Sequence, residues 1–274
     1  MTSLTDPSFQ SNPHPTYARW RAEGPVRRLP DGGWLVTRYE DAKRALSDPR
    51  LSKAYVGVDP AVSRHLLAVD PPDHTRLRRL VSAAFTVRRM ELLRPRIEEI
   101  TEELLDALAG RAEADLIDAF AFPLPIQVIC ELLGVPAADR DRFRSWSTLL
   151  VTGAGTAEEM TRARMAMVDY IRGQVADRRA HGGDDLLAGL VEVRDRADRL
   201  SEDELTSMVF LLLIAGHETT VNLIGNGVFL LLRERDRWEQ LRAQPELLPT
   251  AIEEFLRYEG PVETATLRFA TEEL

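Results

Sequence analysis

The 274-residue sequence has little of several features that would assign it to other classes of protein. Cys130 is its only cysteine, which excludes an internal disulfide and is typical of a reducing cytoplasm. The net charge is −9, and the basic residues are scattered among acids rather than gathered in blocks, so we expect no nucleic-acid partner. The first residues, MTSLTDPSFQSNPHP, have neither the basic cluster nor the apolar run of a secretory signal. Together these absences favour a cytoplasmic location.

One long apolar stretch is present, but polar residues interrupt it. Residues 208–224 read MVFLLLIAGHETTVNLI, with His217, Glu218 and Asn222 inside the run. These residues make the stretch a poor membrane span, so we expect a core helix and no membrane partner. Burying a carboxylate and two hydroxyls is costly unless each finds a partner, so the AGHETT centre requires a specific explanation.

The spacing of apolar residues predicts a mainly α protein with a small β region, forming one domain over residues 1–274. The clearest helix begins at the capping box SEDE, residues 201–204, and runs to Arg233. Glycines between β-branched residues at 25–39 predict a hairpin, whereas residues 51–72 lack periodicity and predict a surface loop. We expect further helices at 14–24, 40–49, 235–244 and 245–260, a strand at 264–274, and a helical region at 73–192 with breaks at Gly110, Pro123, Gly134, Gly153 and Gly182.

Three explanations of AGHETT compete. A zinc-protease HExxH motif fails, because the position of its second histidine is occupied by Val221. Threonine hydroxyls in a core helix can bond back to carbonyls one turn earlier, but this leaves the charge of Glu218 without a partner. The third explanation is a widened helix turn that faces a flat cofactor, with Gly216 allowing close approach. Glu218 and Thr219 would then pass protons through water to a bound oxygen species.

Four motifs favour this third explanation. AGHETT, EEFLR, DHTRLRRLVSAAF and TLRFA resemble the motifs of cytochrome P450, the haem-thiolate monooxygenases, and the N-terminal stretch is similar to the soluble bacterial branch. The resemblance implies a P450-like helical domain that binds haem b (iron protoporphyrin) and inserts one oxygen atom from O2 into an apolar small molecule. The roles that it implies are proton relay for Glu218 and Thr219, lining of the haem and oxygen pocket for Ala215 and Gly216, and propionate binding for His74, Arg78 and Arg268.

The pair Glu254 and Arg257 lies three residues apart, close enough to bridge on a helix. From spacing alone it could be a weak surface ion pair. The resemblance instead implies a buried pair with a structural role near the haem ligand.

The iron ligand itself is missing from the motifs. Cys130 lies in the apolar helical pattern PLPIQVICELLG, where a buried and inert thiol is expected, so we assign no residue as a metal ligand. The resemblance places the thiolate in a glycine-rich cysteine loop beyond residue 274, so we expect a C-terminally truncated chain that lacks this segment. The alternatives are a truncated, non-catalytic haem or apolar-ligand binder and a purely structural helical protein.

The sequence contains no flavin or dinucleotide motif. The resemblance therefore implies a separate ferredoxin or flavodoxin-type electron donor. The basic helix around Arg78 and Arg79 is the expected docking face for such an acidic partner.

Overall fold

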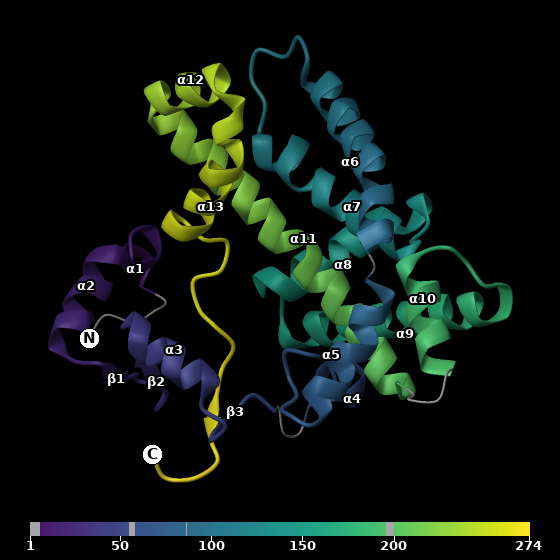
Figure 1. Ribbon diagram of the computed structural model, residues 1–274, viewed down its shortest axis with the longest axis horizontal. Helices are drawn as coiled ribbons and strands as arrows, with labels where there is room; N and C mark the ends of the chain where they lie inside the picture. The colour runs from purple at the N-terminus through teal and green to yellow at the C-terminus, as the bar shows by residue number, and fades with distance from the viewer. Residues whose placement is uncertain (1–5, 55–57, 86, 196–199) are drawn as a thin grey trace. The chain divides into compact units, whose positions relative to one another are not determined.

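The computed structural model describes residues 6–54, 58–85, 87–195 and 200–274 (Figure 1). The chain divides into two compact units. Unit 1 comprises residues 1–54 and 267–274, and unit 2 comprises residues 55–266. Helices dominate and the strands are few and short, which confirms the mainly α fold with a small β region. The expectation of a single domain stays a prediction.

Unit 1 consists of short helices and two small antiparallel sheets. Its hairpin pairs Val26 with Val36, and Gly32 turns the chain with a φ of 90°, a conformation that favours glycine. The predicted hairpin and the predicted helices at 14–24 and 40–49 are confirmed. The elements are α1 (Pro7–Ser11), α2 (His14–Glu23), β1 (Val26–Arg28), β2 (Trp34–Val36), α3 (Tyr39–Ser47), and β3 (Leu51–Ser52) paired with β4 (Phe269–Ala270).

Unit 2 is helical throughout its regular elements. The predicted helical region after residue 73 is confirmed, and Gly134, Gly153 and Gly182 each follow a helix C-terminus with positive φ. The elements are α4 (Pro60–Ser63), α5 (Asp73–Ala84), α6 (Val87–Leu108), η1 (Ile117–Ala121), α7 (Pro123–Leu133), η2 (Ala137–Asp139), α8 (Arg140–Thr152), α9 (Ala157–His181), α10 (Leu186–Asp195), α11 (Glu202–Arg233), α12 (Arg235–Ala243), η3 (Pro245–Leu247) and α13 (Leu248–Tyr258).

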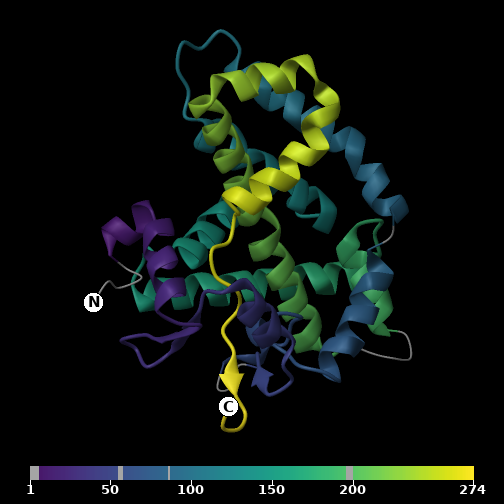
Figure 2. The ribbon, with the colours of Figure 1, turned by 60° about the vertical axis from the view of Figure 1, so that its left-hand side comes forward.

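Helix α11 passes through the middle of unit 2 and contacts α4, α7 and α9 (Figures 1 and 2). The predicted capping box begins it: the Ser201 hydroxyl accepts from the Glu204 N–H at 3.1 Å, and the Glu204 carboxylate accepts from the Ser201 N–H at 2.7 Å. By length and composition alone α11 could cross a membrane. Its packing against three helices is that of a core helix, as the sequence predicts.

Two predictions for the connecting segments are wrong in part. Residues 51–72 do not form only a surface loop, because β3 and α4 lie within them and Ala61, Val62 and Ala68 are buried. Helix α4 is a single turn, too short to show helical periodicity, and it is ordered by packing against α11. Residues 55–57 lie outside the described residues. The predicted strand at 264–274 shortens to two residues, since β3 offers only two for pairing.

Candidate functional site

The middle of α11 has a closed side and an open side. Leu213, His217 and Val221 follow one another at one-turn spacing, and all three are buried. Ala215 is exposed and Thr219 is half-buried. At about 100° per residue these two residues lie on the side opposite His217. The helix is therefore anchored in the core at His217 and open at Ala215 and Thr219.

The hydroxyls of the AGHETT segment bond to the backbone of their own helix. Thr219 Oγ1 donates to the Ala215 carbonyl at 2.9 Å, and Thr220 Oγ1 donates to the Gly216 carbonyl at 3.5 Å. The segment is α-helical from end to end, so the predicted widened turn is wrong. These side-chain bonds are the back-bonding pattern that an intact helix allows. A π-helical turn occurs elsewhere, at η1, where the Phe122 N–H donates to the Ile117 carbonyl at 2.9 Å.

Gly216 has a packing role that the sequence does not reveal. A Cβ at this position would lie 3.0 Å from Cδ1 of Ile129, so the glycine allows α7 to approach α11 closely. The sequence suggested that the missing side chain makes room for a flat cofactor. The structure supplies a different neighbour for it, and contact between Gly216 and haem stays a prediction.

Burial shifts the pKa values of Glu218 and His217 in opposite directions. Glu218 is half-buried, and desolvation raises the pKa of its carboxyl group. No hydrogen bond or ion pair reaches this carboxyl group from the part of the chain that the structure describes. His217 is 1% exposed, and burial lowers the pKa of its imidazole although a bond to the Leu213 carbonyl partly opposes this. The unpartnered carboxyl group is the feature that ordinary core packing leaves unexplained.

Two asparagines on the open side of α11 were missed by the sequence reasoning. Asn222 Nδ2 donates to the Pro261 carbonyl at 3.3 Å, and Asn226 Nδ2 donates to the Glu259 carbonyl at 3.1 Å. These bonds hold the turn after α13 against the helix. The signal in the sequence was two amides four residues apart in an apolar helix, which places them on one face.

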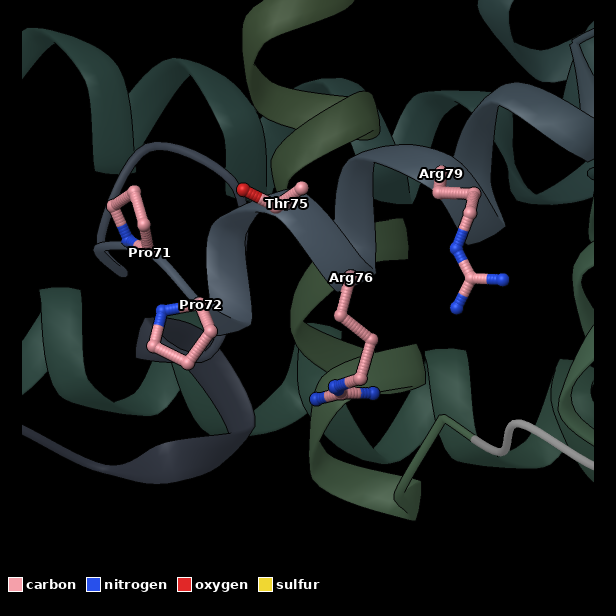
Figure 3. A pocket seen from close by; sticks show the side chains of 5 residues that line it. All are labelled: Pro71, Pro72, Thr75, Arg76 and Arg79. Atoms are coloured by element: carbon pink, nitrogen blue, oxygen red, sulfur yellow. The ribbon is translucent and has the colours of Figure 1, made fainter.

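Helix α5 carries the basic residues predicted to meet haem carboxylates. His74 is half-buried and Arg78 is exposed, four residues apart. On another side of this helix, the Arg76 guanidinium donates to the Glu204 carboxylate at the start of α11. An open pocket of ≈ 650 Å³ lies here, lined by Pro71, Pro72, Thr75, Arg76 and Arg79 (Figure 3). Figure 3 shows Arg76 and Arg79 extending from the same side of the helix.

Arg268 belongs to unit 1, whereas His74 and Arg78 belong to unit 2. Its Nη1 donates to the Leu51 carbonyl at 3.4 Å. Its Nε is buried and has no hydrogen-bond partner among the described residues. A buried guanidinium N–H without an acceptor is suited to an anionic ligand such as a carboxylate.

The Glu254 and Arg257 pair forms, but its predicted burial is wrong. The two side chains make a bidentate bridge of 2.6 and 2.7 Å, with half or more of each side chain exposed. The bridge lowers the pKa of Glu254 and raises that of Arg257. None of the residues of α13 is buried, and the described part of the chain provides no layer over this face. A structural role for the pair stays a prediction.

Cys130 is not a candidate iron ligand in this fold. It is fully buried in α7, and burial raises the pKa of its thiol to about 11. Among the described residues no three His, Cys, Asp or Glu side chains gather as a metal site. By its chemistry the buried Arg268 Nε of unit 1 is suited to a haem carboxylate, and the open side of α11 in unit 2 is suited to an apolar ring. Contact of either with haem stays a prediction. The described residues supply no thiolate for its iron.

Comparison with known proteins supports the interpretation of this chain as a haem protein. No family model matches the chain. Cytochrome P450 107B1 of Saccharopolyspora erythraea is 52% identical over 97% of this chain and 71% of its own length. The monooxygenase PikC of Streptomyces venezuelae is 48% identical over 96% of this chain and 67% of its own length.

Solved structures agree with this relationship. The ligand-free P450 monooxygenase TamI matches with a TM-score of 0.87 and 51% identity, over 99% of this chain and 68% of TamI. The cytochrome P450 PksS of Bacillus subtilis matches with a TM-score of 0.92 and 43% identity, over 100% of this chain and 73% of PksS. The chain therefore belongs to the cytochrome P450 family, whose members are monooxygenases with haem b as cofactor.

Proposed function

We propose that the open side of α11 is the oxygen- and substrate-facing wall of the haem site, with Glu218 and Thr219 as its proton relay. The observation that carries this proposal is the half-buried carboxyl group of Glu218, which has no partner among the described residues. Ordinary packing would pair such a group or replace it. A group that must exchange protons with a bound molecule is left available instead.

Each residue has a distinct task in this proposal. Haem, when bound, supplies the activation of O2, and the protein supplies position and protons. The Thr219 hydroxyl donates to the Ala215 carbonyl, so its lone pairs remain to accept a hydrogen bond from water or from the protonated Glu218, and they hold that donor in place for the bound molecule. The raised pKa of Glu218 moves its carboxyl group toward the range in which it can both give and take protons. The side chain of Ala215 is small and exposed, so it leaves space for a bound molecule beside α11.

His74, Arg78 and Arg268 are proposed to bind the haem carboxylates. Guanidinium groups bind carboxylates through two parallel N–H bonds, which fixes orientation as well as affinity. The buried Nε of Arg268, which lacks an acceptor, supports its place in this set.

The relatives suggest the chemical class of the substrate. They include a polyketide biosynthesis P450 and a hydroxylase of 6-deoxyerythronolide B, and TamI has been solved with tirandamycin C bound. We propose an apolar small molecule of polyketide type as substrate. Electrons would come from a ferredoxin or flavodoxin-type protein in the cytoplasm, docking at the basic helix α5 around Arg78 and Arg79.

The relay is tested with Thr219→Ala in a form of the protein whose haem iron has a thiolate ligand, supplied with such an electron donor. We expect unchanged haem content, with more of the consumed oxygen appearing as hydrogen peroxide and less as product. Thr220→Ala is the matched control, because Thr220 lies next in sequence and also bonds back to the helix. Equal coupling of oxygen to product in the two variants would exclude the relay.

One observation favours a second candidate, a non-catalytic haem or apolar-ligand binder. The only thiol of the chain is buried, and its pKa is raised to about 11. We expect the reduced, carbon monoxide-treated protein to lack the red-shifted Soret band of a haem-thiolate centre. A thiolate-type spectrum from residues 1–274 would exclude the binder and make Cys130 the ligand.

A further inference from the structure

His217 is the member of the AGHETT segment that the proton relay does not use. Its ring is 1% exposed in the core of unit 2. Nδ1 lies 2.8 Å from the Leu213 carbonyl oxygen. A carbonyl can only accept, so Nδ1 must carry the proton, and in the neutral ring Nε2 is then the bare nitrogen. This contact selects one of the two neutral tautomers.

The ring is also held from the side by Phe122, which lies between η1 and α7. The two ring centroids are 5.7 Å apart with an interplanar angle of 77°, an edge-to-face contact. The Arg144 guanidinium lies 4.5 Å from the centroid of the Phe122 ring, and it also reaches Asp118 at 3.4 Å. Phe122 is thus fixed against α8 as well as against His217.

Together, these contacts restrain the rotation of α11 about its axis at His217. The bond to the Leu213 carbonyl lies within α11, so it orients the His217 ring but does not itself restrain the helix. The oriented ring packs against Phe122 on a neighbouring segment, and this contact restrains the rotation of α11 at His217. Glu218 and Thr219 follow immediately, and Thr219 lies on the opposite side of the helix at about 100° per residue. Fixing the rotation at His217 therefore fixes the direction in which both relay residues point.

We propose that His217 is a positioning residue for the relay: a neutral, Nδ1-protonated imidazole that sets the rotation of α11 at Glu218 and Thr219. The proposal rests on the proposed function for its significance, since it assigns how that site is aimed. Its tests need neither haem nor turnover. Failure of the relay experiment therefore leaves these measurements valid, and their failure leaves the relay untouched.

The first test is the tautomer of the wild-type ring. Nitrogen-15 NMR of histidine-labelled protein at neutral pH should show a protonated Nδ1 and a bare Nε2 for His217, identified by its loss in His217→Asn. A protonated Nε2 with a bare Nδ1, or rapid exchange between the two tautomers, would overturn the proposal.

The second test compares variants through the titration of Glu218, followed by carbon-13 NMR of its carboxyl group. His217→Asn keeps a donor for the Leu213 carbonyl but loses the ring that packs against Phe122, so Glu218 should turn toward water and its midpoint should fall toward the ordinary value of 4.5. His217→Phe keeps a ring against Phe122, so its midpoint should stay above 4.5, as in the wild type.

Val221→Ala is the matched control, because Val221 is buried one turn further along the same face. It loses packing but keeps the His217 ring against Phe122, so the Glu218 midpoint should stay at the wild-type value. An equal shift in Val221→Ala and His217→Asn would show that any loss of packing on this face moves the midpoint, which contradicts a specific role of His217. If His217→Phe does not fold, His217→Asn decides: a wild-type midpoint in that folded variant also contradicts the proposal.

Discussion

The two halves of α11 have similar apolar composition but different surroundings. In the first half, Leu205 and Met208 are 0% exposed, and the Glu204 carboxylate is bonded to Arg76 and to the backbone. In the second half, Phe229 and Leu232 are 56% and 62% exposed. These residues of the first half are buried and paired as in an ordinary protein core. The second half combines an apolar side open to solvent with the carboxyl group of Glu218. We place the haem on the open side where the two halves meet, at Ala215 and Thr219.

The largest expected effect comes from the closed half. Leu205→Ala should lower the free energy of unfolding by about 2–5 kcal/mol, because it opens a cavity in a fully buried position. Leu232→Ala, in the open half, should change it by less than about 0.5 kcal/mol. Urea unfolding followed by circular dichroism measures both values. Similar losses in the two variants would mean that the second half is covered in solution.

The carboxyl groups of Glu204 and Glu218, both on α11, give the next contrast. Glu204→Ala should lower the free energy of unfolding by about 1–3 kcal/mol, since it removes the capping box and the bridge between Glu204 and Arg76. Glu218→Gln should be neutral or stabilising at pH 7, because the wild-type carboxylate is charged in a partly desolvated position. Destabilisation by Glu218→Gln would reveal a partner for this carboxylate.

The raised pKa of Glu218 predicts that the free energy of unfolding depends on pH. This pKa is raised in the folded state above the ordinary 4.5, so the unfolded chain loses the Glu218 proton first as the pH rises. The contribution of Glu218 to the free energy of unfolding should therefore decrease from pH 4.5 upward and level off above the folded pKa. The difference between wild type and Glu218→Gln, measured across this range, isolates the effect. A difference that does not change with pH would contradict the raised pKa.

The smallest effect is expected for the exposed bridge of α13. Arg257→Ala should leave the thermal unfolding midpoint unchanged within error, because both partners are already solvated. Calorimetry of this variant beside Arg235→Ala, which removes another exposed helical ion pair, makes the comparison. A large drop confined to Arg257→Ala would show that α13 is covered in solution.

The sequence predicts the elements whose signals are local. The capping box at Ser201 and Glu204 is a pattern of four residues, and it places the start of α11 correctly. The hairpin around Gly32 is equally local. Neither depends on what lies across the fold.

Features that depend on distant neighbours escape such reasoning. The burial of α4 comes from its contact with α11, and the close neighbour of Gly216 is Ile129 on another helix. The exposure of Glu254 and Arg257 depends on what covers α13, which a four-residue motif does not contain. Within the candidate site, the residue types follow from the motif, whereas the open side, the role of His217 and the two asparagine anchors follow only from packing.

The central claim is that the open side of α11 faces the haem, and ring-current shifts test it most directly. Zinc protoporphyrin, a diamagnetic analogue, would be bound to protein with labelled alanine, threonine and methionine methyl groups. We predict shifts at Ala215 and Thr219 and none at Met208, which is buried in the closed half. Unshifted Ala215 and Thr219 signals in the bound protein, or a shift at Met208 instead, would contradict the account.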